Sequence, residues 1–203
     1  MDKPIIIGFD GGPLSGKSST LNYLRNQFTK HPIRGYRFIF AEEAATKLFQ
    51  ANPTRSGGTI DFQLDVMKLQ LQDIGLAKAA AAATSDTVVL IADRSLISGL
   101  AVYMPEEYRK LFDYDELSLL YDALFYFDSA VDFANDTKNG NCYRKESSDE
   151  IRLLAKQTRS ALLSHHNFIG IPVFDDIRAK YSYVESKILD FINNTSAKSE
   201  EVA

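Results

Sequence analysis

An apolar run leads directly into a glycine-rich turn near the start of the chain. Residues 4–9 read Pro-Ile-Ile-Ile-Gly-Phe, which is typical of a buried strand, and residues 17–29 have the pattern of a helix. The turn between them, residues 11–18, reads Gly-Gly-Pro-Leu-Ser-Gly-Lys-Ser. A buried strand joined to a helix by a short turn is the repeating unit of α/β domains with a parallel sheet.

The turn also matches the pattern G-x-x-x-x-G-K-[S/T] at every defined position. In that pattern the backbone N–H groups point inward at phosphates, the lysine reaches the β and γ oxygens, and the hydroxyl ligates Mg²⁺. The following helix adds the positive end of its dipole. The sequence therefore predicts a nucleoside triphosphate site, with ATP and Mg²⁺ as the expected cofactors and GTP as an alternative. The residues expected to bind them are Gly11, Gly12, Pro13, Leu14, Ser15, Gly16, Lys17, Ser18 and Ser19.

Four further apolar segments alternate with helical patterns along the rest of the chain. This alternation predicts an α/β fold, a three-layer P-loop NTPase with a central five-stranded parallel sheet. The expected remaining strands are 36–41, 87–92, 123–128 and 168–174. The expected remaining helices are 42–50, 60–83, 95–103, 115–121, 148–166 and 177–193.

Composition narrows the class of protein. The chain has 203 residues and a formal net charge of −4, which suits one domain, expected at 1–194, with a polar tail at 195–203. Proteins that bind nucleic-acid polymers usually carry a basic face, so we expect no such partner. No window reaches the roughly 18 apolar residues of a membrane span. The single cysteine, Cys142, fits a reducing compartment, so we expect a cytoplasmic protein with no membrane partner.

Acidic residues follow the second and third expected strands. Asp93 lies at the carboxyl end of the third, where open α/β sheets bind ligands. It can hold Mg²⁺ through water or accept a proton from a substrate hydroxyl, and Arg94 beside it can stabilise transferred charge. Glu42 and Glu43 follow the second strand, and either is a candidate general base. Acidic residues also favour helix starts without any catalytic role, so the choice among Glu42, Glu43 and Asp93 stays open.

Two glutamines in the third expected helix allow two interpretations. Gln63 and Gln70 are seven residues apart, so both can lie on one face of a helix, where they would either bind a base in a cleft or be solvated.

Residues 135–150 are expected to form a lid, because the Asn-Gly-Asn segment within this range tolerates unusual backbone angles. Arg144 would swing over the phosphates from this lid, or else be an ordinary surface arginine.

Taken in order, these motifs resemble a known family. They are "GGPLSGKSS", "EEAA" after the second strand, "FQ" with a later glutamine, "LIADRSLISGLAVY", "NGNCYRKES" with a later "EI", and "IPVF" before the last helix. The order is similar to that of the P-loop ATPase/kinase-like family, an AAA-domain family that includes nicotinamide riboside kinase domains and the TRPL translocation defect proteins. Deoxynucleoside kinases are similar in outline. The resemblance covers nearly the whole chain.

The resemblance implies a kinase-type strand order, with the third strand beside the first. It implies Lys17 and Ser18 at the phosphates and Mg²⁺, Glu43 or Asp93 as the base, and Arg94 and Arg144 as charge clamps. The chain departs from the family in two ways. Thr46 stands where the family often has an arginine, and no tryptophan is present, so stacking on a base would fall to Phe62 or a tyrosine.

The expected function is a small-molecule kinase that moves the γ-phosphoryl group of ATP to a hydroxyl of a nucleoside-like substrate. The alternative is an ATP- or GTP-binding regulatory or switch module with little transfer activity. A Ras-like switch is disfavoured because the residues after the third strand read Asp-Arg-Ser-Leu and not Asp-x-x-Gly. The expected partners are a nucleoside triphosphate and a nucleoside-like small molecule, and a homodimer stays open.

Overall fold

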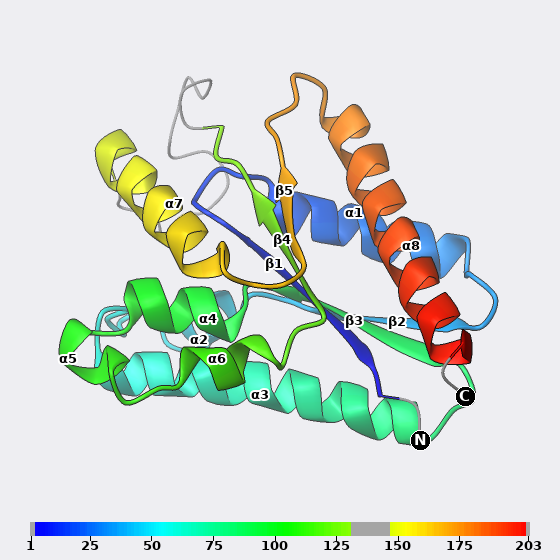
Figure 1. The fold of residues 1–203 in the computed structure, drawn as a ribbon. Helices are drawn as coiled ribbons and strands as arrows, with labels where there is room; N and C mark the ends of the chain where they lie inside the picture. Colours follow the sequence, from blue (N-terminus) through cyan, green and yellow to red (C-terminus); the bar gives the residue numbers. More distant parts are fainter. Residues whose placement is uncertain (1–2, 131–146, 202–203) are drawn as a thin grey trace.

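A parallel sheet of five strands forms the centre of the molecule (Figure 1). The computed structural model describes residues 3–130 and 147–201. The strands are β1 (Ile5–Gly11), β2 (Tyr36–Ala41), β3 (Thr87–Asp93), β4 (Ala123–Phe127) and β5 (Phe168–Ile171). Their spatial order is β2-β3-β1-β4-β5, and every pairing is parallel. The predicted α/β class is confirmed, and β3 lies beside β1 as the resemblance implies.

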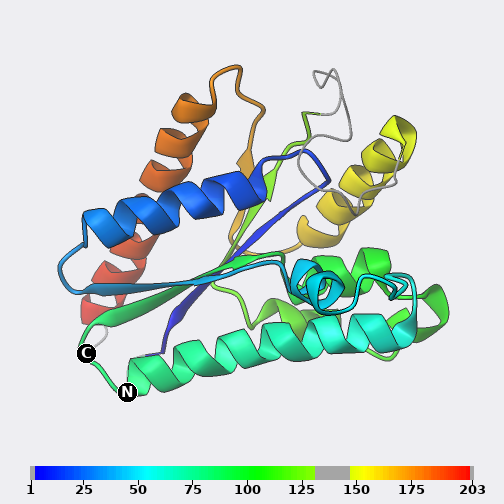
Figure 2. The same cartoon turned by 180° about the vertical axis from the view of Figure 1, so that it is seen from behind.

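Helices cover both faces of this sheet (Figure 1, Figure 2). On one face lie α1 (Lys17–Lys30) and α8 (Ile177–Glu201). The opposite face carries α3 (Ile60–Ala82), α6 (Tyr114–Ser118) and α7 (Ser148–Leu162). Shorter elements are α2 (Ala44–Ala51), α4 (Leu96–Ser98), the π-helical turn η1 (Gly99–Tyr103) and α5 (Glu106–Arg109).

The central strand β1 explains why the apolar runs are continuous. Ile5, Ile7 and Phe9 face the core beneath α1 and α8, whereas Ile6 faces the core beneath α3. Side chains alternate between the faces of a strand, so a strand covered on both faces needs apolar residues at successive positions. All of β1 is buried. The two cores therefore fix the register of β1, and with it the place of the glycine-rich turn at its end.

Several helix bounds differ from the sequence prediction. The expected helix 95–103 is split into α4 and η1, and α5 was not expected. The last helix runs to Glu201 and not to 193, because residues 177–201 contain no glycine or proline that would end it. Residues 195–201, expected in a polar tail, thus continue α8. The domain boundary at 194 stays a prediction.

No helix within the described ranges is both long enough and apolar enough to cross a membrane.

Candidate functional site

The glycine-rich turn wraps around the amino end of α1. Gly16 is the N-cap residue of α1 and has φ 80°, in the left-handed region where a side chain would be strained. Leu14 adopts φ 59° despite having a side chain. Non-glycine residues hold such angles at a cost of about 1–3 kcal/mol, and they cluster at ligand sites. The conformation is therefore the curled one that the phosphate-loop pattern predicts.

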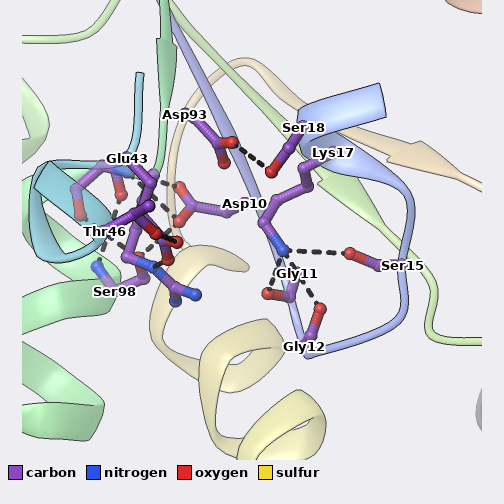
Figure 3. A network of polar contacts seen from close by, with 12 residues as sticks. Asp10, Gly11, Gly12, Ser15, Lys17, Ser18, Glu43, Thr46, Asp93 and Ser98 are labelled. Carbon is purple, nitrogen blue, oxygen red and sulfur yellow. Dashed lines mark hydrogen bonds and ion pairs between the residues drawn. The ribbon is translucent and has the colours of Figure 1, made fainter. Parts of the chain in front are cut away.

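Lys17 lies across the mouth of this loop (Figure 3). Its Nζ donates hydrogen bonds to the carbonyl oxygens of Gly11 and Gly12, at 2.9 and 3.0 Å, and to Ser15 Oγ at 3.0 Å. The pKa of Lys17 is lowered to about 8, mainly by burial and to a lesser extent by the nearby Arg94 cation. Among the described residues, the hydrogen-bond acceptors of this buried ammonium are all neutral oxygens, so an anion in the loop would stabilise it further.

Asp93 and Ser18 meet beside the loop. The Ser18 hydroxyl donates to Asp93 Oδ2 at 2.6 Å, while the buried Asp93 Oδ1 has no hydrogen-bond partner among the described residues. Burial raises the pKa of Asp93, against the pull of Lys17. A hydroxyl and a carboxylate with a free oxygen are a donor set that suits Mg²⁺, which is usually held by one or two protein oxygens together with substrate phosphates. The predicted metal residues thus lie together and fit the ion.

Arg94 adopts an unusual backbone conformation directly after β3. Its φ is 86°, and its backbone is fixed on both sides: its N–H donates to the Phe9 carbonyl at 2.8 Å, and its carbonyl accepts from Gln70 Nε2 at 2.9 Å. Its guanidinium lies over the Tyr103 ring, 4.9 Å from the centroid. The buried Nη1 has no hydrogen-bond partner in residues 3–130 or 147–201. A fixed cation with a free donor is therefore available at this point.

The two adjacent glutamates differ in where they point. The side chain of Glu42 is 57% exposed and pairs with Arg25 on the surface at 2.9 Å. Glu43 turns inward, with its side chain 23% exposed, and its Oε1 pairs with Arg94 Nε at 3.2 Å. The Thr46 hydroxyl donates to Glu43 Oε2 at 2.7 Å. Of the two glutamates, Glu43 is the one that faces the site.

Its surroundings keep Glu43 ionised. Burial alone would raise the pKa of Glu43, but the Arg94 cation and the hydrogen bond from Thr46 outweigh it, so the pKa lies below its usual value. Thr46 thus supplies a hydrogen-bond donor to this carboxylate.

A cavity of about 420 Å³ opens between the phosphate loop, α2, α3 and η1. Its polar lining side chains include Glu43, Thr46, Gln63 and Arg94, and Pro13 of the phosphate loop contributes to its wall. The larger apolar and aromatic side chains lining it are Phe49, Phe62, Val66, Val102 and Tyr103. A hollow of about 520 Å³ beside β2 is larger, but among the described residues no acidic side chain and no residue of the glycine-rich turn 11–18 lines it. The chemistry is concentrated in the first cavity.

Comparison with known proteins agrees with this geometry. The family whose model matches the chain is described as an AAA domain, and the match covers residues 6–181. That interval contains the phosphate loop, β2 to β5, all of β1 except Ile5, and the residues that line the cavity, and it is well over half of the chain.

The chain belongs to this AAA domain family. No curated protein matches it. As an AAA-type P-loop domain it is a nucleotide-binding protein. The match does not name nicotinamide riboside kinases or TRPL translocation defect proteins, so that finer resemblance stays a prediction.

Gln63 and Gln70 of α3 are both buried, so the solvated alternative is wrong for these two residues. Gln70 holds the Arg94 carbonyl. Gln63 donates to the Gly57 carbonyl and lines the cavity. Gln70 therefore positions the strained Arg94, and Gln63 lies where it can contact a ligand.

Sequence reasoning missed two buried charged residues at the site. Asp10 accepts a hydrogen bond from the Ser95 N–H at 3.2 Å. It also accepts one from the Ser98 hydroxyl (Figure 3), and these bonds join the strand before the phosphate loop to α4. An acid within the apolar run of β1 was a usable signal for it. Lys180 Nζ donates to the Ser15 carbonyl, and no local pattern marks that lysine.

Two sequence predictions cannot be placed. Arg144 and most of the expected lid at 135–150 lie outside the described residues. The described end of that range begins α7, where Ser147 and Glu150 form a capping box.

We expect Lys17→Ala to weaken triphosphate binding by roughly 10- to 100-fold, because hydrogen bonds from a charged donor contribute about 1.5–3 kcal/mol. The fold should survive, since the Lys17 ammonium contacts the loop and not the core. Calorimetric titration with ATP and GTP measures the loss, and circular dichroism checks the fold. Unchanged affinity for both nucleotides would contradict the phosphate-loop assignment.

The lowered pKa of Lys17 predicts that triphosphate binding takes up a proton at alkaline pH. Bound phosphate favours the charged ammonium and so raises its pKa. Below a pH of about 8 the lysine is already protonated, whereas above it a proton must be bound together with the ligand, so affinity should fall as pH rises. Calorimetry in buffers of different ionisation enthalpy measures this uptake. If the number of protons taken up on binding is the same below and above that pKa, Lys17 is not the group responsible.

We expect Asp93→Asn to remove the Mg²⁺-dependent part of triphosphate affinity, since the amide cannot replace a charged oxygen ligand. In EDTA, the variant and the original chain should bind ATP equally well. A variant that still gains affinity on adding Mg²⁺ would place the metal elsewhere.

Proposed function

We propose that this AAA domain is a small-molecule kinase that transfers the γ-phosphoryl group of ATP, with Mg²⁺, to a hydroxyl of a nucleoside-like substrate. The observation that carries the proposal is the place of Glu43. Its ionised carboxylate lines a cavity that shares Pro13 with the phosphate loop. A transfer site needs such a carboxylate within reach of an acceptor held next to the γ-phosphate.

The charges around Glu43 suit phosphoryl transfer. The reaction needs little covalent chemistry from the protein, so catalysis consists of positioning and of stabilising charge on the transferred group. Thr46 and Arg94 fix both oxygens of the Glu43 carboxylate, which would orient the acceptor hydroxyl and accept its proton. Lys17 and the free Nη1 of Arg94 would stabilise the negative charge on the phosphoryl oxygens.

The cavity also fits the class of acceptor. Its volume of about 420 Å³ lies within the range of small-molecule sites, about 300–1,000 Å³. Phe49 and Phe62 line it as a ring pair with centroids 4.7 Å apart, and Tyr103 faces it from η1. Aromatic faces favour a flat ring, and the amide of Gln63 offers a polar contact. The proposed partners are thus a nucleoside triphosphate and its acceptor, with no nucleic-acid polymer or membrane.

One observation favours a second function. Glu43 already has partners for both carboxylate oxygens, and such an ion pair could simply join the end of β2 to the end of β3. The protein would then be an ATP- or GTP-binding regulatory module with little transfer activity.

An acceptor screen followed by a matched pair of variants separates the two functions. Incubation of the protein with Mg-ATP and panels of nucleosides, nicotinamide riboside and nucleotides, with product detection by intact mass, should reveal a phosphorylated product. Glu43→Gln should then slow transfer by the roughly 10²–10⁴-fold typical of a lost general base. The affinity of the variant for triphosphate should stay within about twofold of that of the original chain, because in the phosphate-loop motif the loop binds the phosphates and this carboxylate does not.

Glu42→Gln is the control, because that neighbouring carboxylate points to the surface, and its transfer rate should be unchanged. Equal rates for both variants would refute Glu43 as the base. A screen that yields no product with any acceptor would favour the regulatory module.

A further inference from the structure

Lys180 is a buried lysine whose ammonium contacts the backbone of the phosphate loop at Ser15. It lies near the start of α8 and is only 6% exposed. Its Nζ donates to the Ser15 carbonyl at 2.5 Å and lies over the Phe127 ring, 5.4 Å from the centroid. A Cβ at Gly16 would come within 3.1 Å of the same nitrogen. The ammonium therefore packs directly against the Ser15–Gly16 peptide.

Burial of this charge is costly for stability alone. An ammonium taken out of water is destabilising unless an opposite charge or several hydrogen bonds compensate it. Among the described residues, the compensation comes from one carbonyl, one ring face and the Asp128 carboxylate, which attracts the ammonium electrostatically without forming an ion pair with it. Burial accordingly lowers the pKa of Lys180, against the pull of Asp128. A neutral side chain of similar length would avoid that penalty, so a reason beyond packing is needed.

The geometry of the peptide group supplies such a reason. In a trans peptide the C=O of one residue and the N–H of the next point in opposite directions. A cation on the Ser15 carbonyl therefore fixes the Gly16 N–H on the opposite side of the peptide plane, and it polarises that N–H into a stronger donor. In the phosphate-loop pattern, the loop N–H groups point at the bound phosphates.

Ser15 is thus held by two lysines. Lys17 contacts its hydroxyl at 3.0 Å, and Lys180 contacts its carbonyl. We propose that Lys180 is a positioning residue of the nucleotide site, which orients and polarises the Ser15–Gly16 peptide toward the phosphates of the ligand. This inference rests on triphosphate binding by the loop, and it holds for either function proposed above.

The test compares Lys180→Met with Lys187→Met. Lys187 lies two turns further along α8 and also covers an aromatic ring, that of Tyr183 at 5.5 Å, so it is a matched lysine away from the loop. Calorimetry with Mg-ATP and with inorganic tripolyphosphate is the readout. Lys180→Met should weaken both ligands by about the same factor, roughly tenfold, as expected for one charge-assisted contact. Lys187→Met should weaken neither.

Two further readouts separate positioning from a merely structural role. Without ligand, Lys180→Met should melt no lower than the original chain, because the substitution removes a buried charge. In the nucleotide complex, the Gly16 amide proton resonance should shift on Lys180→Met and return toward its original position in Lys180→Arg, which restores the charge. Lys180→Arg should also recover most of the affinity.

Each adverse outcome has a definite meaning. Unchanged affinity of Lys180→Met for both ligands would overturn the inference. Weaker binding of ATP but not of tripolyphosphate would also overturn it, because Lys180 would then act on the nucleoside part of the ligand and not on the phosphates. If Lys180→Met does not fold, Lys180→Gln takes its place, and failure of both to fold would show that the lysine serves folding alone. If the original chain binds neither ligand, the nucleotide site itself fails. If Lys17→Ala loses binding but Lys180→Met does not, only this inference fails.

Discussion

The pairing of β1 with β3 is the constraint on which the site depends. In this register Phe9 lies opposite Asp93, and the Phe9 carbonyl accepts the N–H of Arg94. The strand that ends in the phosphate loop is thereby held beside the strand that ends in Asp-Arg-Ser. Because both strands are buried on both faces, a shift of one residue would turn their core side chains to the wrong layer. The positions of Asp93 and Arg94 relative to the loop therefore follow from the packing of the core.

Charges that are expensive to bury gather at this junction. Lys17, Glu43, Asp93 and Arg94 lie close enough to shift one another's pKa values, and the Asp10 carboxylate acts on the pKa values of Lys17 and Arg94. Each charge is tolerated because opposite charges and hydrogen bonds surround it. The compensation is incomplete where a ligand is proposed, since Asp93 Oδ1 and Arg94 Nη1 have no partners within the described part of the chain. A triphosphate with its metal, or an acceptor, would supply what these two atoms lack.

The sequence predicted those features of the site whose structural causes lie close together in the chain. The loop residues Lys17 and Ser18 were predictable because the pattern, the preceding strand and the following helix all lie within one short segment. The choice between Glu42 and Glu43 was not, because it depends on Arg94, which is 51 residues from Glu43 in the chain. Ser15 and Lys180 are 165 residues apart, so only the folded chain reveals their contact.

Backbone irregularities were also beyond prediction. The positive φ of Arg94 is rare for a residue with a side chain, and it is imposed by Phe9 on one side and Gln70 on the other. The helix expected at 95–103 changes to a π-helical turn at Gly99, where the Met104 N–H reaches the Gly99 carbonyl. Such turns occur frequently at functional sites, and this one brings Tyr103 to the cavity and over Arg94.

The most direct test of the site is a crystal structure of the protein with Mg²⁺ and a non-hydrolysable ATP analogue. The phosphates should lie in the loop against Lys17, with the metal at Ser18 and Asp93. The γ-phosphate should face the cavity that Glu43 lines, and the adenine ring should lie outside that cavity. An adenine ring seated between Phe62 and Tyr103 would contradict the proposal, because the cavity would then belong to the nucleotide and leave no place for an acceptor.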